Sequence, residues 1–246
     1  MGSVSGRLRK AARAGMEVKV KALLQYPGCD TLAKDKNGIT ALMEAAWNGH
    51  EACVKMLLPK SDALAVKANG MTALMWAADC GAEACVKALL PKSNALAKSH
   101  KGWTALMLAG NGRETCVKIL LPVSDALARD KYGWSALMHA AINGHEECIA
   151  LLLPVSDALV KCKSGVTALM RAACSGNEAC VKLLLPVSNI LVKDKEGRTA
   201  SSWARVLEEE TLSQFIDAYV LSQSERATID EALGSGAHLG RASPRM

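Results

Sequence analysis

Five cysteines stand at nearly constant intervals along the chain, and such a row of thiols could bind metal ions or form disulfides. They are Cys53, Cys85, Cys116, Cys148 and Cys180. If each lies on an equivalent helix of a stacked array, neighbouring helices are about 8–10 Å apart. A disulfide needs Cα atoms about 4.4–6.8 Å apart, and a Zn–S bond is about 2.3 Å long. We therefore interpret these cysteines as small buried core residues, and we expect neither a metal site nor a cofactor.

The other reactive side chains form no catalytic pattern. Four further cysteines lie in expected turns and loops, where we expect exposed thiols: Cys29, Cys80, Cys162 and Cys174. His50 and His145 each follow the glycine of an expected turn, which favours a structural, hydrogen-bonded role. No Ser/His/Asp or Cys/His arrangement recurs, and the glycines occur one per turn rather than in a phosphate-binding loop. The sequence therefore favours a protein that is not an enzyme.

A recurring phrase, Gly-x-Thr/Ser-Ala-Leu-Met, sets the frame in which these residues stand. Its hydroxyl residue recurs every 31 or 32 positions, as Thr40, Thr72, Thr104, Ser135, Thr167 and Thr199. A period in this range indicates a solenoid, in which a small unit buries its apolar face only by stacking on copies of itself. Such an array offers a long surface to partners rather than a closed pocket.

Residues 35–66 show how one unit is built. Asn37-Gly38 has turn chemistry, and Thr40 is placed to cap a helix over residues 41–47. A second helix is expected over residues 51–58, with one apolar stripe and a favourable Glu51/Lys55 pair. Pro59 then ends it. Each unit is therefore a pair of short helices that need neighbours for stability.

The order Asp-Lys-Asn-Gly-x-Thr-Ala-Leu-x-x-Ala-Ala-x-x-Gly-His-x-x-x-Val-Lys-x-Leu-Leu over residues 35–58 resembles the ankyrin repeat. The resemblance implies an all-α solenoid of stacked helix–turn–helix units joined by hairpin loops, over about residues 8–220. It also implies a non-enzymatic module that binds a protein or peptide partner. In each full repeat a methionine replaces the buried histidine of the family, at Met43, Met75, Met107, Met138 and Met170. Residues 108–112 lack one position, so we expect an irregular turn there.

We divide the chain by this alignment. An N-terminal partial, capping repeat covers residues 1–34, and full repeats follow over 35–66, 67–98, 99–129 (with the one-residue deletion), 130–161 and 162–193. A C-terminal capping repeat covers 194–222. Residues 223–246 are expected to hold a short helix, over 223–233, and a flexible tail, over 234–246.

The positions that vary between repeats are the candidates for partner recognition, because framework positions are needed for the fold. In arrays that resemble this one, hairpin tips and first helices line the concave binding surface. On that mapping the expected partner-binding residues are Trp47, Met71, Trp76, Trp103, Tyr132, Trp134, His139 and Ile142. Tryptophan and tyrosine are enriched in binding hot spots. For Trp103 and Trp134, packing over the neighbouring hairpin as framework is an equal alternative.

Charge supports a second hypothesis. The net charge is +6, and a lysine ridge follows the hairpins at Lys34, Lys36, Lys67, Lys98, Lys101, Lys131, Lys163 and Lys195. The alternative function is therefore binding of an anionic partner or nucleic acid. Asp35, Asp130 and Asp194 interleave with the ridge, so nucleic acid is not the expected partner. We expect no membrane span, a monomer, and, from the reduced cysteines, an intracellular, cytoplasmic scaffold.

Overall fold

The computed structural model describes residues 3–236, and within them the fold is all-helical, with one isolated β-bridge and no strand. The α-helices are α1 Val4–Arg13, α2 Glu17–Leu24, α3 Ala41–Trp47, α4 Glu51–Leu57, α5 Ala73–Cys80, α6 Glu83–Leu89, α7 Ala105–Ala109, α8 Glu114–Leu120, α9 Ala136–Ile142, α10 Glu146–Leu152, α11 Ala168–Cys174, α12 Glu178–Leu184, α13 Ala200–Val206 and α14 Glu210–Gly236. Short 3₁₀ turns follow five of them, at Leu58–Lys60, Leu90–Lys92, Leu121–Val123, Leu153–Val155 and Leu185–Val187.

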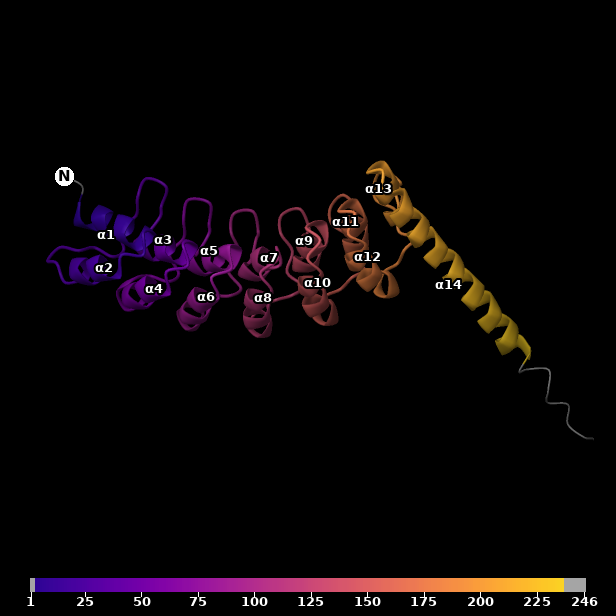
Figure 1. Ribbon diagram of the computed structural model, residues 1–246, viewed down its shortest axis with the longest axis horizontal. Coiled ribbons are helices and arrows are strands. Elements are labelled where there is room, and N and C mark those ends of the chain that lie inside the picture. Colours follow the sequence, from indigo (N-terminus) through magenta and orange to yellow (C-terminus); the bar gives the residue numbers. More distant parts are fainter. Residues whose placement is uncertain (1–2, 237–246) are drawn as a thin grey trace, which may run out of the picture.

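The helices form two rows along one axis (Figure 1). The odd-numbered helices α1 to α13 pack on one another in sequence, and the even-numbered helices α2 to α12 form the second row. Hairpin loops project beside the odd-numbered row (Figure 1). The expected solenoid of stacked helix–turn–helix units is therefore confirmed.

The hydroxyl residue of the recurring phrase caps each odd-numbered helix from α3 to α13. In α7, for example, the Thr104 hydroxyl accepts a hydrogen bond from Met107 N at 3.2 Å. Ser135 accepts from Met138 N in the same way, at 3.3 Å. A side-chain acceptor satisfies an N–H that has no partner inside the helix.

Replacing Thr104 by alanine is expected to lower the free energy of unfolding by about 1 kcal/mol, because the Met107 N–H loses its acceptor. Replacing it by serine should leave stability nearly unchanged, since Ser135 already fills the equivalent position. Chemical denaturation of the three proteins measures both effects. Equal stabilities of the alanine and serine variants would show that the hydroxyl has no capping role.

The core is a continuous stack of small and medium apolar side chains. Leucine, methionine and paired alanines from each odd-numbered helix are buried, as are the cysteine and valine or isoleucine of each partner helix. The five methionines at the family's histidine position are at most 2% exposed, so they pack in the core. The five regularly spaced cysteines are buried as well.

The loop cysteines are less accessible than the sequence suggested. Cys29, Cys80 and Cys174 are half-buried, and Cys162 is buried. The prediction of an exposed thiol is therefore wrong for Cys162. Its position opens a hairpin and packs against the core rather than facing solvent.

The expected irregularity after the deletion is present. Helix α7 has five residues, against seven or eight in the other odd-numbered helices from α3 to α13. Gly112 keeps the left-handed conformation of the turn, with φ of 88°. Arg113 stands where His50 stands in the first full repeat. Its Nε donates to Asp79 O at 3.0 Å, as the His50 ring contacts Arg13 O at 3.1 Å, so both side chains tie one turn to the preceding repeat.

The end of the chain differs from expectation. Helix α14 runs without a break from Glu210 to Gly236, so there is no separate short helix over residues 223–233, and residues 234–236 are helical rather than tail. Repeat alignment suggested a boundary at 222/223, but no proline or glycine interrupts residues 210–233. The helix packs against α13 and then leads away from the array (Figure 1). The rest of the expected tail, 237–246, lies outside the described residues. Within the described part of the chain, no helix has the length and apolar character to cross a membrane.

Candidate functional site

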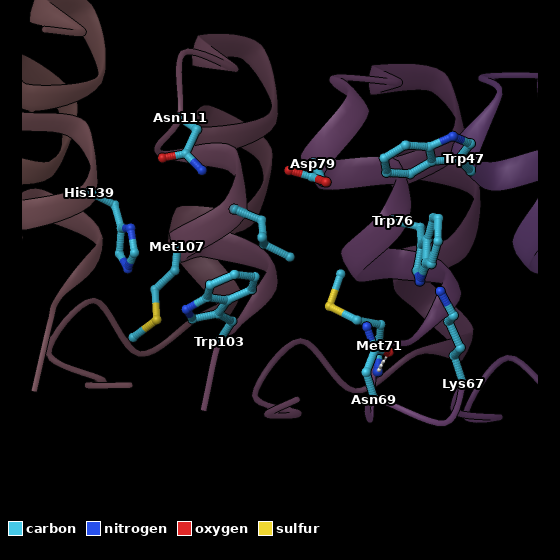
Figure 2. Close-up of a pocket in the computed structure, with 11 residues that line it drawn as sticks. Trp47, Lys67, Asn69, Met71, Trp76, Asp79, Trp103, Met107, Asn111 and His139 are labelled. Atoms are coloured by element: carbon cyan, nitrogen blue, oxygen red, sulfur yellow. Dashed lines mark hydrogen bonds between the residues drawn. The ribbon is translucent and has the colours of Figure 1, made fainter. Parts of the chain in front are cut away.

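Three of the five aromatic side chains predicted from the variable positions, Trp47, Trp76 and Trp103, gather in a groove beside helices α3, α5 and α7 (Figure 2). We call it the tryptophan groove; its volume is about 310 Å³. It is lined by Trp47, Lys67, Asn69, Met71, Trp76, Asp79, Trp103, Met107, Leu108, Asn111 and His139. The lining comes from the first helices of consecutive repeats and from the hairpins before them, which is why residues about 32 positions apart meet.

Trp47 and Trp76 form one end of the groove. Their ring centroids are 4.4 Å apart in an edge-to-face arrangement, a geometry that aromatic pairs favour. The Lys67 ammonium lies 4.7 Å from the Trp76 ring centroid. Figure 2 shows Trp47 and Trp76 together at this end, with Met71 and Asn69 rising from the hairpin beside them. Trp47 is 41% exposed, whereas Met71 is buried and forms part of the floor.

A second hollow continues the groove toward helix α9. We call it the aromatic pocket; its volume is about 360 Å³, and it is lined by Trp103, Asp130, Tyr132, Trp134 and His139. It shares Trp103 and His139 with the tryptophan groove, so the two form one continuous surface. Trp134 lies 5.2 Å from the His139 ring, centroid to centroid. Tyr132 is the most exposed of the lining residues, at 59%.

Asp130 holds this pocket together. Its side chain is 1% exposed, and Oδ1 accepts from Tyr132 N at 2.8 Å and from Trp134 N at 2.9 Å. Oδ2 accepts from Trp103 Nε1 at 3.3 Å. His139 Nε2 lies 3.4 Å from Oδ2 without the alignment of a hydrogen bond. The carboxylate therefore fixes a hairpin and an indole from the preceding repeat at once.

Burial governs the titration of His139 and Asp79 in the tryptophan groove and of Glu44, which lies outside it. It lowers the pKa of His139, and the Asp130 carboxylate opposes that shift only in part, so the ring is neutral near pH 7. Burial also raises the pKa of Asp79 and of Glu44, against the opposing charges of Arg113 and Arg13 respectively. Among the residues that the structure describes, no group of three or more His, Cys, Asp or Glu side chains is placed to hold a metal ion.

Seven of the eight side chains expected to bind a partner line these two hollows. Ile142, the eighth, is half-buried at the end of α9 and lines neither. Trp103 and Trp134 each pack against the core, as the framework alternative expected, and each also lines the aromatic pocket. Sequence reasoning missed Asp130, which it counted only among the acidic residues of the lysine ridge. The sequence did carry a signal, because an aspartate recurs at the same place in the repeat at Asp35 and Asp194. In the structure these two aspartates accept from the same two backbone positions as Asp130.

The lysine ridge is largely exposed, but part of it is engaged within the fold. Lys34 Nζ donates to Val66 O and Lys98 Nζ to Arg129 O, each at 3.4 Å. Lys67 and Lys101 stack on Trp76 and Trp103. The Lys34 and Lys98 bonds join neighbouring hairpins. The other two contacts place Lys67 and Lys101 on the aromatic surface and not on a separate anion-binding track.

Comparison with known proteins agrees with this architecture. The family model for ankyrin repeats in three copies matches residues 8–98 and 92–162, and the single ankyrin-repeat model matches residues 164–195. The chain belongs to the ankyrin-repeat family, whose members are generally protein–protein interaction modules built on a non-enzymatic scaffold.

One solved structure similar to this chain is the crystal structure of the human ASB11 ankyrin repeat domain. The two share 25% sequence identity with a TM-score of 0.78, over 85% of this chain and 96% of that domain. No curated protein matched the sequence significantly.

Proposed function

We propose that this protein binds a protein or peptide segment on the concave face of the array, along the tryptophan groove and the aromatic pocket. The observation that carries the proposal is the continuity of the aromatic surface from Trp47 to Trp134. The chain has only nine aromatic residues, and five of them line these two hollows. Exposed aromatic surface of this kind marks partner sites, and tryptophan and tyrosine dominate binding hot spots.

The rings are also held in place before any partner arrives. Trp103 is fixed by its bond to Asp130, and Trp134 by the Arg171 guanidinium, 3.9 Å from its ring centroid. Side chains that are already ordered lose little conformational freedom on binding, so more of their contact energy appears as affinity. The long open surface suits an extended segment that contacts several repeats.

Replacing Tyr132 by alanine is expected to weaken partner binding at least tenfold, because Tyr132 is an exposed aromatic of the pocket and supports no other side chain by a hydrogen bond within the described residues. The matched control is Tyr26→Ala, since Tyr26 is 56% exposed and lies outside both hollows. Affinity capture from cell extract with the wild-type chain and both variants, quantified by mass spectrometry, compares them.

Partners lost with Tyr132→Ala but retained with Tyr26→Ala would support binding at the aromatic pocket. If both variants capture the wild-type set, the aromatic pocket is not the binding surface. If capture is independent of Tyr132 but falls steeply with salt, the lysine ridge and an anionic partner explain it instead.

A further inference from the structure

Arg171 is an uncompensated positive charge beside the aromatic pocket. Its guanidinium stacks on Trp134 at 3.9 Å, and its Nε is buried and makes no hydrogen bond. Among the described residues, no carboxylate lies within ion-pair distance of it. Arg198 stacks on Trp203 at the same distance but is neutralised by Asp194 and Glu196. A half-buried guanidinium without an anionic partner marks a place where a ligand carboxylate gains a strong, charge-assisted contact.

One residue of the hairpin explains why Arg171 has no carboxylate partner. In three repeats an aspartate stands nine positions before the helical residue that it faces: Asp35 before Glu44, Asp130 before His139 and Asp194 before Trp203. Asp194 accepts from Trp203 Nε1 at 3.0 Å. Cys162 stands at the same position relative to Arg171. The hairpin itself is unchanged, since Cys162 N donates to Val166 O as Asp130 N donates to Trp134 O. The array therefore lacks a carboxylate at the one repeat where the facing residue is an arginine.

The aromatic pocket next to Arg171 is unsuited to a cationic ligand. The Lys101 ammonium already lies 4.8 Å from the Trp103 ring centroid, and the Arg171 guanidinium already stacks on the Trp134 ring. Asp130, which could attract a cation, is buried and already accepts three hydrogen bonds. The pocket surface that remains is indole, phenol and neutral imidazole. An uncharged apolar side chain fits the aromatic pocket, and the positive charge of Arg171 beside the pocket attracts an anion.

We propose that the groove recognises a peptide segment in which an aliphatic or aromatic side chain adjoins an aspartate or glutamate. The apolar side chain enters the aromatic pocket, and the acidic side chain pairs with Arg171. This inference rests on the proposed function and specifies the partner's chemistry. An internal acidic side chain, rather than a chain terminus, is the occupant because the row of helices continues past Arg171 into α13, so nothing ends the surface there (Figure 1).

A library of random nine-residue peptides, displayed on phage and selected on the full chain, tests the inference. Selected sequences should carry Asp or Glu within two positions of a large apolar residue. For a synthetic peptide of that kind, Arg171→Glu should weaken binding at least tenfold by fluorescence anisotropy, since a charged hydrogen-bonded contact becomes a repulsion. Selection on Arg171→Glu should favour Lys or Arg in place of the acid. Arg226→Glu, in the part of α14 that leads away from the array, is the matched control and should change neither result.

A second variant tests the same point with the arginine in place. Cys162→Asp restores the carboxylate found at Asp130 and Asp194 and should neutralise Arg171 internally. The acidic preference should then disappear while apolar peptides still bind. Thermal denaturation of each variant shows whether its fold is intact.

The possible outcomes separate the inference from the proposed function. Peptides that need Tyr132 but show no acidic preference, or bind Arg171→Glu and Cys162→Asp as tightly as wild type, would overturn the inference and leave the function standing. Enrichment of lysine or arginine by the wild-type chain would also overturn it. A selection that yields no peptide dependent on Tyr132 would overturn both.

Discussion

Replacing Leu106 by alanine is expected to lower the free energy of unfolding by about 2–5 kcal/mol. Leu106 is fully buried in α7, the shortest odd-numbered helix, between α5 and α9. Each repeat of a solenoid is stabilised mainly by its two neighbours. A cavity at this central position therefore weakens two interfaces at once, and a five-residue helix has few other contacts to compensate.

Chemical denaturation followed by far-UV circular dichroism measures the effect. The matched control is Leu127→Ala, because Leu127 is 60% exposed and its truncation should change stability by less than about 0.5 kcal/mol. A similar loss in both variants would mean that burial in α7 does not determine the stability of the array. A broadened or two-step transition for Leu106→Ala would show that the repeats on either side of α7 separate energetically.

Asp130→Ala is expected to cost about 2–4 kcal/mol of stability, because it removes the acceptor of two backbone N–H groups and of the Trp103 indole. Asp130→Asn should fall between alanine and wild type. Its amide oxygen can still serve the backbone groups, but its NH₂ then faces the indole donor. Trp103 should lose its fixed position in both variants, so partner binding should weaken together with stability.

Denaturation curves and tryptophan fluorescence follow the two consequences. Asp125→Ala provides the comparison, since Asp125 is exposed and accepts a single backbone bond, from Leu127 N at 2.9 Å. Stability that is equal in Asp125→Ala and Asp130→Ala would contradict the role of Asp130 as the acceptor that holds the pocket together.

The repeating part of the fold could be predicted well because the same capping and packing residues recur in every repeat. Caps such as Thr104 recur six times, and the methionines at the family's histidine position and the regularly spaced cysteines recur five times each, so every repeat tests the same assignment again. Alignment was misleading where repetition ends. Helix α14 continues past residue 222 because helix propagation depends on local backbone preference, not on the repeat period.

The candidate site was predicted only in part. Variation between repeats singled out the aromatic side chains, because these depart visibly from the framework. The variation between repeats did not show which charged side chains contact one another. Asp130 looked like one more acidic residue of the ridge, and Cys162 like an exposed loop thiol, although the first is a buried acceptor and the second takes the place of a carboxylate. Those roles depend on contacts between hairpins, which a single sequence does not display.

Burial of the five regularly spaced cysteines determines when their thiols can be oxidised. Burial raises the pKa of Cys85, Cys116 and Cys180 to about 11 and raises that of Cys53 and Cys148 as well. A protonated, enclosed sulfur is a poor nucleophile, so oxidants reach it only when the repeat around it opens. A sulfur oxidised to the sulfinic or sulfonic level could not return to that apolar site, so a brief local opening would leave a permanent defect. The packing of each repeat thus determines the chemical lifetime of its own thiol.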